Sequence, residues 1–247
     1  MAANFWGSSQ WKLLEQDEIG HVFPADQENG ISPEDAKIIK IHMSEYIQSL
    51  AHQVKVRQRV VATAIAYFRR VYTRKSFVEY DPRLVAPTCL YLASKAEEST
   101  VQAKLLIFYM KKTKKCSYEV PDILHMEMRL LEALDFYLII YHPYRSLIQL
   151  LQDAGITEMT KITWSLVNDL YKTDLILMYP PFMIALACIF VASAFQDKDT
   201  LAWFEELRID MHVIKTITME IFDFYENYST LSPEKLSAAL KKLPQRT

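Results

Sequence analysis

Two stretches of the chain, 99 positions apart, are versions of one segment. Residues 82–94 read PRLVAPTCLYLAS, and residues 181–193 read PFMIALACIFVAS. Five positions are identical, and most of the others keep their apolar character. Each stretch opens with a proline and lacks strict apolar–polar alternation, which is typical of a helix with proline in its first turn. The pair therefore predicts an internal repeat.

The repeat extends beyond these stretches. A shift of 88 positions places residues 135–137 (DFY) over residues 223–225 (DFY) and aligns Asp122 with Asp210. The second shift is 11 positions shorter than the first. We therefore expect the fourth helix of the second repeat to be the shorter one.

The periodicity is helical along nearly the whole chain, and no Asn-Gly hairpin joins two apolar runs. The predicted fold class is all-α, with two tandem five-helix repeats and flanking helices at both ends. The predicted parts are an N-terminal segment (1–30, with a short helix over about 8–17), the first repeat (31–141), the second repeat (142–229) and a C-terminal segment (230–247, with a helix over 232–242).

Small residues predict which helix of each repeat is central. They recur through the third helix and would let four neighbouring helices approach closely. They are Ala86, Cys89 and Ala93 in the first repeat and Ala185, Cys188 and Ala192 in the second.

Two further helices carry local signals. Ser32 can cap the first helix of the first repeat, with Pro33 in its first turn. The fifth helix of that repeat begins near Pro121, and its spacing predicts a buried stripe. That stripe is Leu124, Met128, Leu131 and Leu134.

Composition restricts the possible functions. The 247 residues are 51% hydrophobic and 23% charged, with a formal net charge of −2, which argues against a chain that coats nucleic acid. The chain has only four glycines, so a Gly-rich phosphate-binding loop would be hard to build from it. Three cysteines without metal-ligand spacing, and no uninterrupted apolar run near the start, predict a soluble intracellular protein.

Motifs for catalysis and metal binding do not appear. The six histidines show no ligand spacing, and no nucleophile elbow or Walker loop occurs, so we expect neither an enzyme nor a bound cofactor or metal. Cys116 follows two lysines that favour its thiolate, but it has no evident His or acid partner. We interpret it as a surface cysteine.

Charge distinguishes the two repeats. Lys95 ends the third helix of the first repeat, and its counterpart is Ala194; Glu127 lies in the fifth helix, and its counterpart is Lys215. One interpretation is a surface ion pair, worth about 0–1 kcal/mol. The other is a polar clamp beside an apolar surface, which would hold a partner helix.

Residues 93–98 read ASKAEE, which resembles the L-A-S-K-x-E-E signature of the cyclin family. Glu127 stands where cyclins place a second kinase-contacting charge. Five further stretches resemble the cyclin C branch, so that the resemblance covers essentially the whole chain. They are residues 4–6 (NFW), 60–64 (VVATA), 86–89 (APTC), 141–145 (YHPYR) and 179–188 (YPPFMIALAC).

The resemblance implies a non-catalytic subunit that activates a cyclin-dependent kinase of the Mediator kinase module and so regulates RNA polymerase II transcription in the nucleus. The first repeat of a cyclin pushes the kinase αC helix inward, which completes the kinase's own Lys–Glu pair. The kinase-binding residues carried over are Lys95 and Glu127, with Glu98 supporting them. Tyr91 and Leu92 lie near this surface, although burial in the core is the simpler role for both.

A second surface is predicted on the helix over about 158–174. Its core stripe is Ile162, Leu166 and Leu170, and Trp164 lies off that stripe, near Asn168 and Asp169. A large aromatic side chain beside hydrogen-bonding groups is typical of a protein-binding anchor, here for other Mediator subunits. The alternative is a Trp covered by a neighbouring helix. Tyr225 and Trp6 are the expected neighbours.

Two basic runs, residues 55–75 and 111–115, raise the question of nucleic acid. A solvated helix face explains the first, and a nuclear-import signal can explain the second, so direct nucleic-acid binding is not favoured. The alternative function is a general transcription factor of the TFIIB type, which has the same doubled fold and binds promoter DNA. Such proteins usually carry an N-terminal zinc ribbon and a basic balance, and here no Cys precedes Cys89.

Overall fold

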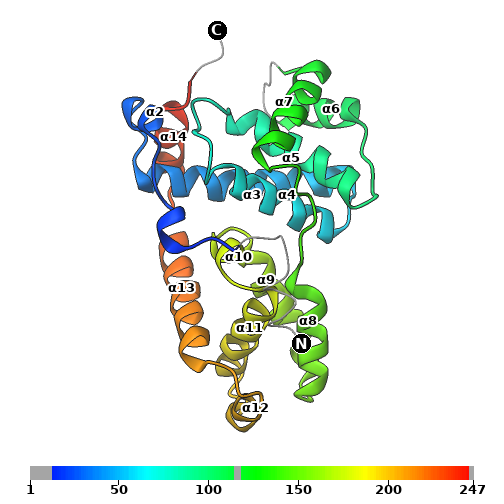
Figure 1. Ribbon diagram of the computed structural model, residues 1–247, viewed down its shortest axis with the longest axis vertical. Helices are drawn as coiled ribbons and strands as arrows, with labels where there is room; N and C mark the ends of the chain where they lie inside the picture. The colour runs from blue at the N-terminus through cyan, green and yellow to red at the C-terminus, as the bar shows by residue number, and fades with distance from the viewer. Residues whose placement is uncertain (1–12, 114–117, 245–247) are drawn as a thin grey trace. The chain divides into compact units, whose positions relative to one another are not determined.

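The computed structural model describes residues 13–113 and 118–244, and every regular element in these residues is a helix (Figure 1). The prediction of an all-α fold is therefore confirmed. The chain divides into two compact units: residues 14–140 with 231–247, and residues 1–13 with 141–230. We call them the α5 unit and the α11 unit, after their central helices. Within the described ranges, none of the helices combines the length and apolar character that a bilayer span requires.

The α5 unit is built around α5. This helix contacts α3, α4, α6 and α7, and the small residues Ala86, Cys89 and Ala93 are fully buried in these contacts. The predicted central place of this helix is confirmed. The elements of the unit are η1 (Gln16–Glu18), α2 (Pro24–Glu28), α3 (Pro33–Val54), α4 (Gln58–Val71), α5 (Pro82–Ala96), α6 (Ala103–Thr113), α7 (Val120–Ala133) and α14 (Pro233–Lys241).

The α11 unit repeats this plan around α11, which contacts α8, α9, α10 and α13. The helix α12 corresponds to α6, the fourth helix of the first repeat. It has 6 residues whereas α6 has 11, so the expected shortening is confirmed. The elements of the unit are α8 (Pro143–Asp153), η2 (Thr157–Met159), α9 (Thr160–Leu170), α10 (Leu175–Met178), α11 (Pro181–Phe195), α12 (Leu201–Glu206) and α13 (Met211–Ser229).

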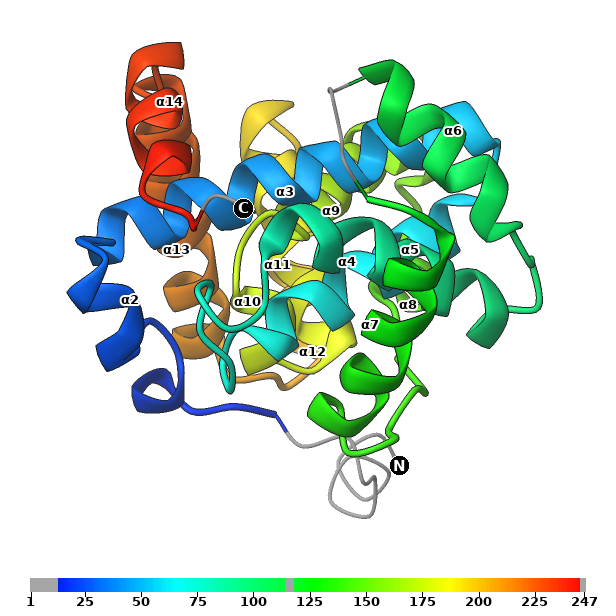
Figure 2. The same cartoon turned by 90° about the horizontal axis from the view of Figure 1, so that it is seen from above.

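The helix α14 packs on α3 and so belongs to the α5 unit, although it follows the α11 unit in sequence (Figure 2). Ser32 caps α3 as predicted, because its Oγ accepts a hydrogen bond from the Asp35 amide at 3.1 Å. Lys242 Nζ, just after α14, bonds to the Asp35 carboxylate at 2.6 Å. Ala239 and Leu243 are buried. Apolar burial and this ion pair, with a longer one between Lys235 and Glu34 at 3.9 Å, therefore fix α14 to the start of α3.

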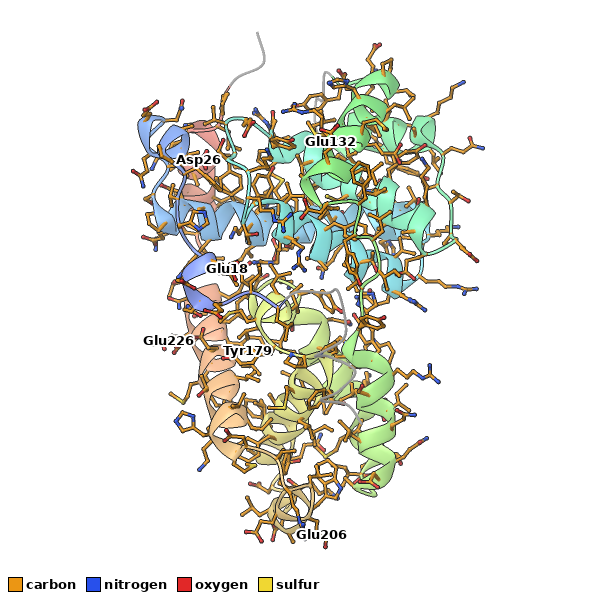
Figure 3. All side chains as sticks on the ribbon, viewed as in Figure 1. Glu18, Asp26, Glu132, Tyr179, Glu206 and Glu226 are labelled. Carbon is orange, nitrogen blue, oxygen red and sulfur yellow. The ribbon has the colours of Figure 1, made fainter. Side chains whose placement is uncertain are left out.

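A buried carboxylate orders the loop that leads into α5. Asp26 of α2, labelled in Figure 3, accepts hydrogen bonds from the amides of Phe77 and Val78 at 3.2 and 3.1 Å. Burial raises the pKa of Asp26, and these two bonds oppose the rise. The short helix α2 thus positions the chain shortly before α5 begins.

The predicted buried stripe of α7 is partly wrong. Leu134 is buried, but Leu124 and Met128 are exposed. The buried residues of α7 are Ile123, Met126, Glu127, Leu130 and Ala133. Apolar residues occur around most of this helix, so that two stripes share helical spacing. The buried stripe contains Glu127, and a charged residue normally marks the exposed face of a helix. The prediction therefore chose the other stripe.

The Asp-Phe-Tyr sequence adopts two conformations. Residues 223–225 lie within α13. In contrast, Asp135 and Phe136 follow the end of α7 and have φ of 53° and 57°, in the left-handed region, so that the helix cannot continue through them. Arg74 contributes to this ending, because its guanidinium donates to the Ala133 carbonyl at 3.3 Å and pairs with the Asp135 carboxylate. This tertiary contact therefore adds to the local backbone conformation that ends α7.

Some predictions fall on residues that the structure does not describe. The helix expected over about 8–17 lies mostly outside the described residues, and within them only η1 follows at Gln16–Glu18. Trp6 and Cys116 also lie outside. The predicted C-terminal helix over 232–242 is confirmed as α14, and its cap is the Ser232 hydroxyl, which accepts from the Lys235 amide at 3.3 Å.

Candidate functional site

Lys95 and Glu127 form an ion pair on the α5 unit. Lys95 Nζ donates to Glu127 Oε1 at 2.7 Å, joining the last turn of α5 to the middle of α7. The Lys95 side chain is 42% exposed and the Glu127 side chain 9%. The hydrogen bond to Glu127 raises the pKa of the Lys95 ammonium. The pair is thus assembled in the isolated chain with its cationic end at the surface.

An aromatic ring supports the cation. Lys95 Nζ lies 4.8 Å from the centre of the half-buried Tyr91 ring, one helical turn earlier on α5. A cation over a ring face is attracted by about 0.5–1 kcal/mol at an exposed position. The Tyr91 ring therefore limits the positions that the Lys95 side chain can adopt. Leu92, the other residue predicted near this surface, is buried in the core.

The end of α5 is held by Glu97, a residue that sequence reasoning did not select. Its carboxylate accepts from Arg59 Nε at 2.6 Å and from the hydroxyl of Thr63 at 2.7 Å, both on α4. Glu97 is itself the C-cap residue of α5, two positions after Lys95. Because α4 holds this residue, it also fixes the position from which Lys95 projects. The sequence offered two signals for this role: the place of Glu97 in the ASKAEE stretch, and the basic residues Arg57 and Arg59 at the start of α4.

Glu98 has a backbone role in addition to the predicted one. It is exposed and has a φ of 53°, in the left-handed region, where it turns the chain out of α5. The amide of Ser99 then donates to the Ser94 carbonyl at 2.8 Å, and the amide of Val101 donates to Ser94 Oγ at 3.1 Å. The prediction that Glu98 supports kinase binding stays a prediction.

Exposed apolar side chains flank the pair on α7 and occur on α6 of the same unit. Leu124 and Met128 are exposed, and they lie three residues before and one residue after Glu127. Leu124 and Met128 are four residues apart and so share one face of the helix. Leu105 and Phe108 of α6 are exposed as well. The α5 unit thus combines an ion pair with apolar surface that no described residue buries.

The predicted second surface lies in the α11 unit, and Trp164 is partly covered there. Its ring stacks on that of Tyr144 of α8, with centroids 4.5 Å apart and planes at 28°. The Tyr144 hydroxyl donates to Asn168 Oδ1 at 2.9 Å. One face of the Trp164 ring is therefore covered by a neighbouring helix, as the alternative interpretation expected, and the residue as a whole is half-buried. Of the predicted core stripe, Leu166 and Leu170 are buried and Ile162 is half-buried.

Asp169 joins α9 to α13. It accepts from the Tyr225 hydroxyl at 3.0 Å and from Lys172 Nζ at 3.0 Å. Burial, followed by the charge of Asp169, raises the pKa of Tyr225, which keeps this hydroxyl protonated as a donor. Lys172 also lies over the Tyr228 ring at 5.0 Å. The structure thus brings together Trp164 with Asn168 and Asp169 with Tyr225.

Titratable groups elsewhere in the described part of the chain do not form a metal-binding constellation. No group of three or more His, Cys, Asp and Glu side chains is arranged there to hold a metal ion. Cys89 and Cys188 are fully buried at matching places in the two repeats, and burial raises the pKa of both thiols. Both are therefore protonated and poor nucleophiles.

Comparison with known proteins decides the family. The sequence profile of the cyclin N-terminal domain matches residues 11–139. Cyclin-C1-1 of rice is 60% identical over 256 residues, which cover all of both chains. The chain belongs to the cyclin family. The resemblance found in residues 93–98 is thereby confirmed.

Further relatives extend this result. The cyclin is 40% identical to Cyclin-C of the rat, over 99% of this chain and 91% of the rat protein. Among solved structures it resembles a chain of the yeast RNA Pol II CTD kinase CTDK-1 complex, with a TM-score of 0.70 and 20% identity, covering 95% of this chain and 86% of the other. At that identity the structural match supports the fold alone.

Proposed function

We propose that this cyclin is the non-catalytic subunit that binds and activates a cyclin-dependent kinase of the Mediator kinase module, and so regulates RNA polymerase II transcription in the nucleus. The observation that carries the proposal is the assembled Lys95–Glu127 pair beside exposed apolar side chains of α7. The kinship with cyclins C of rice and rat supports the choice of kinase.

The pair is suited to a peptide backbone at the end of a partner helix. The Lys95 ammonium has donors beyond the one that Glu127 receives, and a carboxylate can accept more than one hydrogen bond. Together they can bind a carbonyl and an amide at adjacent positions of the kinase. Because Glu97 and Tyr91 hold Lys95 in place, little side-chain entropy remains to be lost on binding.

Exposed apolar groups would supply most of the affinity. Leu124 and Met128 of α7 and Phe108 of α6 would be buried against the kinase αC helix, as anchors inside a polar rim. A cyclin that binds only the inward position of αC raises the population of the active kinase by its differential affinity for that state. Activation thus requires no chemical group from the cyclin.

The test is co-purification with the Mediator-associated kinase and assay of its activity. We expect Lys95→Glu and Glu127→Lys each to weaken kinase binding at least tenfold, because each places a repulsive charge in the pair. The double variant K95E/E127K restores an ion pair of reversed orientation and should remain folded while still activating poorly. Lys161→Glu, at an exposed lysine of α9, is the matched control.

Full activation by the reversed double variant would show that the pair serves stability alone and would overturn the kinase-contact role. Equal loss in the Lys161→Glu control would show a general effect of charge. Normal binding and activation by both single variants would place the kinase on another surface.

We propose that other Mediator subunits bind the surface of Trp164, Asn168, Asp169 and Tyr225, with Trp6 as a further contributor. Support comes from the exposed remainder of the Trp164 ring and from the hydrogen-bonded carboxylate of Asp169. In a pulldown, Trp164→Ala and Asp169→Ala should retain the kinase and lose the remaining subunits. Retention of those subunits by folded variants would contradict the assignment.

A further inference from the structure

A separate exposed apolar surface lies on α11 and α13 of the α11 unit. Phe195, the last residue of α11, is 64% exposed, and Met219 and Phe222 of α13 are 61% and 42% exposed. The rings of Phe195 and Phe222 meet edge to face, with centroids 6.3 Å apart. Met219 and Phe222 are three residues apart and so are neighbours on one helix face. We call these three side chains the α11–α13 patch.

The patch lies on the helices that correspond to those of the charged pair in the other repeat. The repeat aligns α11 with α5 and α13 with α7, and it places Ala194 at the position of Lys95 and Lys215 at that of Glu127. The pair cannot form in the second repeat. Large apolar side chains reach solvent from these helices instead, so that this surface suits a partner of different chemistry.

The chain around the patch is strongly acidic. Residues 196–229 contain eight Asp and Glu against three Lys and Arg, a formal charge of −5 within a chain of −2. Asp223 and Glu226 are exposed on α13, and Glu226 lies on the side of that helix away from α11 (Figure 3). Lys198, one of the three cations, is paired with Glu158 at 3.1 Å. The stretch therefore carries a net negative formal charge, although Lys215 is exposed on α13 one turn before Met219.

We propose that the α11–α13 patch docks an amphipathic helix of another protein whose apolar face is flanked by Lys and Arg. Side chains at positions i, i+3 and i+4 of such a helix would cover Phe195, Met219 and Phe222. Its cations would lie near Asp223 and Glu226, which favour them by charge and disfavour an acidic helix. Large contiguous apolar groups with a polar rim are the usual form of a protein-binding surface.

Binding of a labelled model peptide to the full chain tests the proposal. The probe is an 18-residue amphipathic helix of Leu and Lys, followed by fluorescence anisotropy; a scrambled peptide of the same composition and a Leu/Glu helix are the comparison probes. We expect the Leu/Lys helix to bind and the F195A/M219A variant to weaken it at least about fivefold. Asp223→Lys should weaken it about threefold, and less at high salt.

Ile139→Ala, which removes an apolar side chain that is 61% exposed in the segment after α7 of the other unit, is the control and should change the affinity less than twofold. The truncated side chains are mostly exposed, so the variants should melt within a few degrees of the native chain. Equal binding of the scrambled peptide, or unchanged binding by F195A/M219A, would overturn the proposal. So would a dimer in sedimentation equilibrium that F195A/M219A dissociates, since a second copy would then be the occupant.

Discussion

Removing Lys95 should cost more stability than neutralising Glu127, although both changes break the same ion pair. Lys95→Met leaves the carboxylate of Glu127 largely buried without its cation, whereas Glu127→Gln leaves the partly exposed ammonium of Lys95 free to be hydrated. An exposed pair contributes about 0.2–1 kcal/mol, and breaking a buried one costs about 3–5 kcal/mol. With one buried and one partly exposed member, we expect about 2 kcal/mol for Lys95→Met and about 0.5–1 kcal/mol for Glu127→Gln.

Thermal unfolding followed by circular dichroism measures both changes. For a unit of this size, 1 kcal/mol shifts Tm by about 2–4 °C, so Lys95→Met should lower it by about 4–8 °C. The double variant K95M/E127Q should be more stable than the sum of the single effects predicts, with a coupling of about 1 kcal/mol. The contact of Lys95 with the Tyr91 ring is absent from Lys95→Met and from the double variant, so it cancels from the coupling.

Two results would refute this reasoning. A coupling below about 0.3 kcal/mol would mean that the pair makes no net contribution to folding. A greater loss in Glu127→Gln than in Lys95→Met would mean that desolvation of Glu127 is not the dominant cost. In that case the carboxylate would stabilise the fold through contacts other than the one with Lys95.

The remaining predictions concern pH, the end of α5 and the thiols. The folded-state pKa of Lys95 is raised above its unfolded value of about 10.4. The extra stability of the native chain over Lys95→Met should therefore be full below about pH 10 and should shrink as the pH rises through the folded-state pKa. Urea unfolding of both proteins across this pH range measures the difference. Glu97→Ala removes an acceptor of the buried Thr63 hydroxyl and the partner of Arg59, and it should lower the unfolding free energy by about 1–2 kcal/mol and kinase activation with it. Unchanged activation by a destabilised variant would exclude the role of Glu97 in positioning Lys95. Cys89 and Cys188 should react with a thiol reagent such as Ellman's only after unfolding, and rapid reaction of either in the native chain would contradict its burial.

Much of the architecture follows from local sequence because helical spacing and proline punctuation are local signals. The repeated stretch of residues 82–94 and 181–193 identified both central helices, and their small residues are the ones packed against neighbours. The shorter fourth helix of the second repeat followed from two alignment shifts. None of these inferences required a contact between distant residues.

Contacts between distant residues account for what the sequence did not reveal. Glu127 is buried because Lys95, 32 residues earlier, neutralises it, so the inward face of α7 could not be chosen from α7 alone. Asp26 holds amides about 50 residues away, and nothing near it in the sequence indicates that role. The charged site was predicted as a pair of positions, but Glu97, which fixes one of them, became visible only with α4 in place.

The return of α14 to α3 makes the α11 unit an insertion within the α5 unit. During synthesis the ribosome must therefore complete the inserted unit before the enclosing one can be closed. Until then the part of α3 on which α14 packs, with Ala239 and Leu243 buried, stays uncovered in the nascent chain. A message cut short after the inserted unit would yield a product with this part of α3 uncovered, which chaperones and proteases can recognise before any partner does.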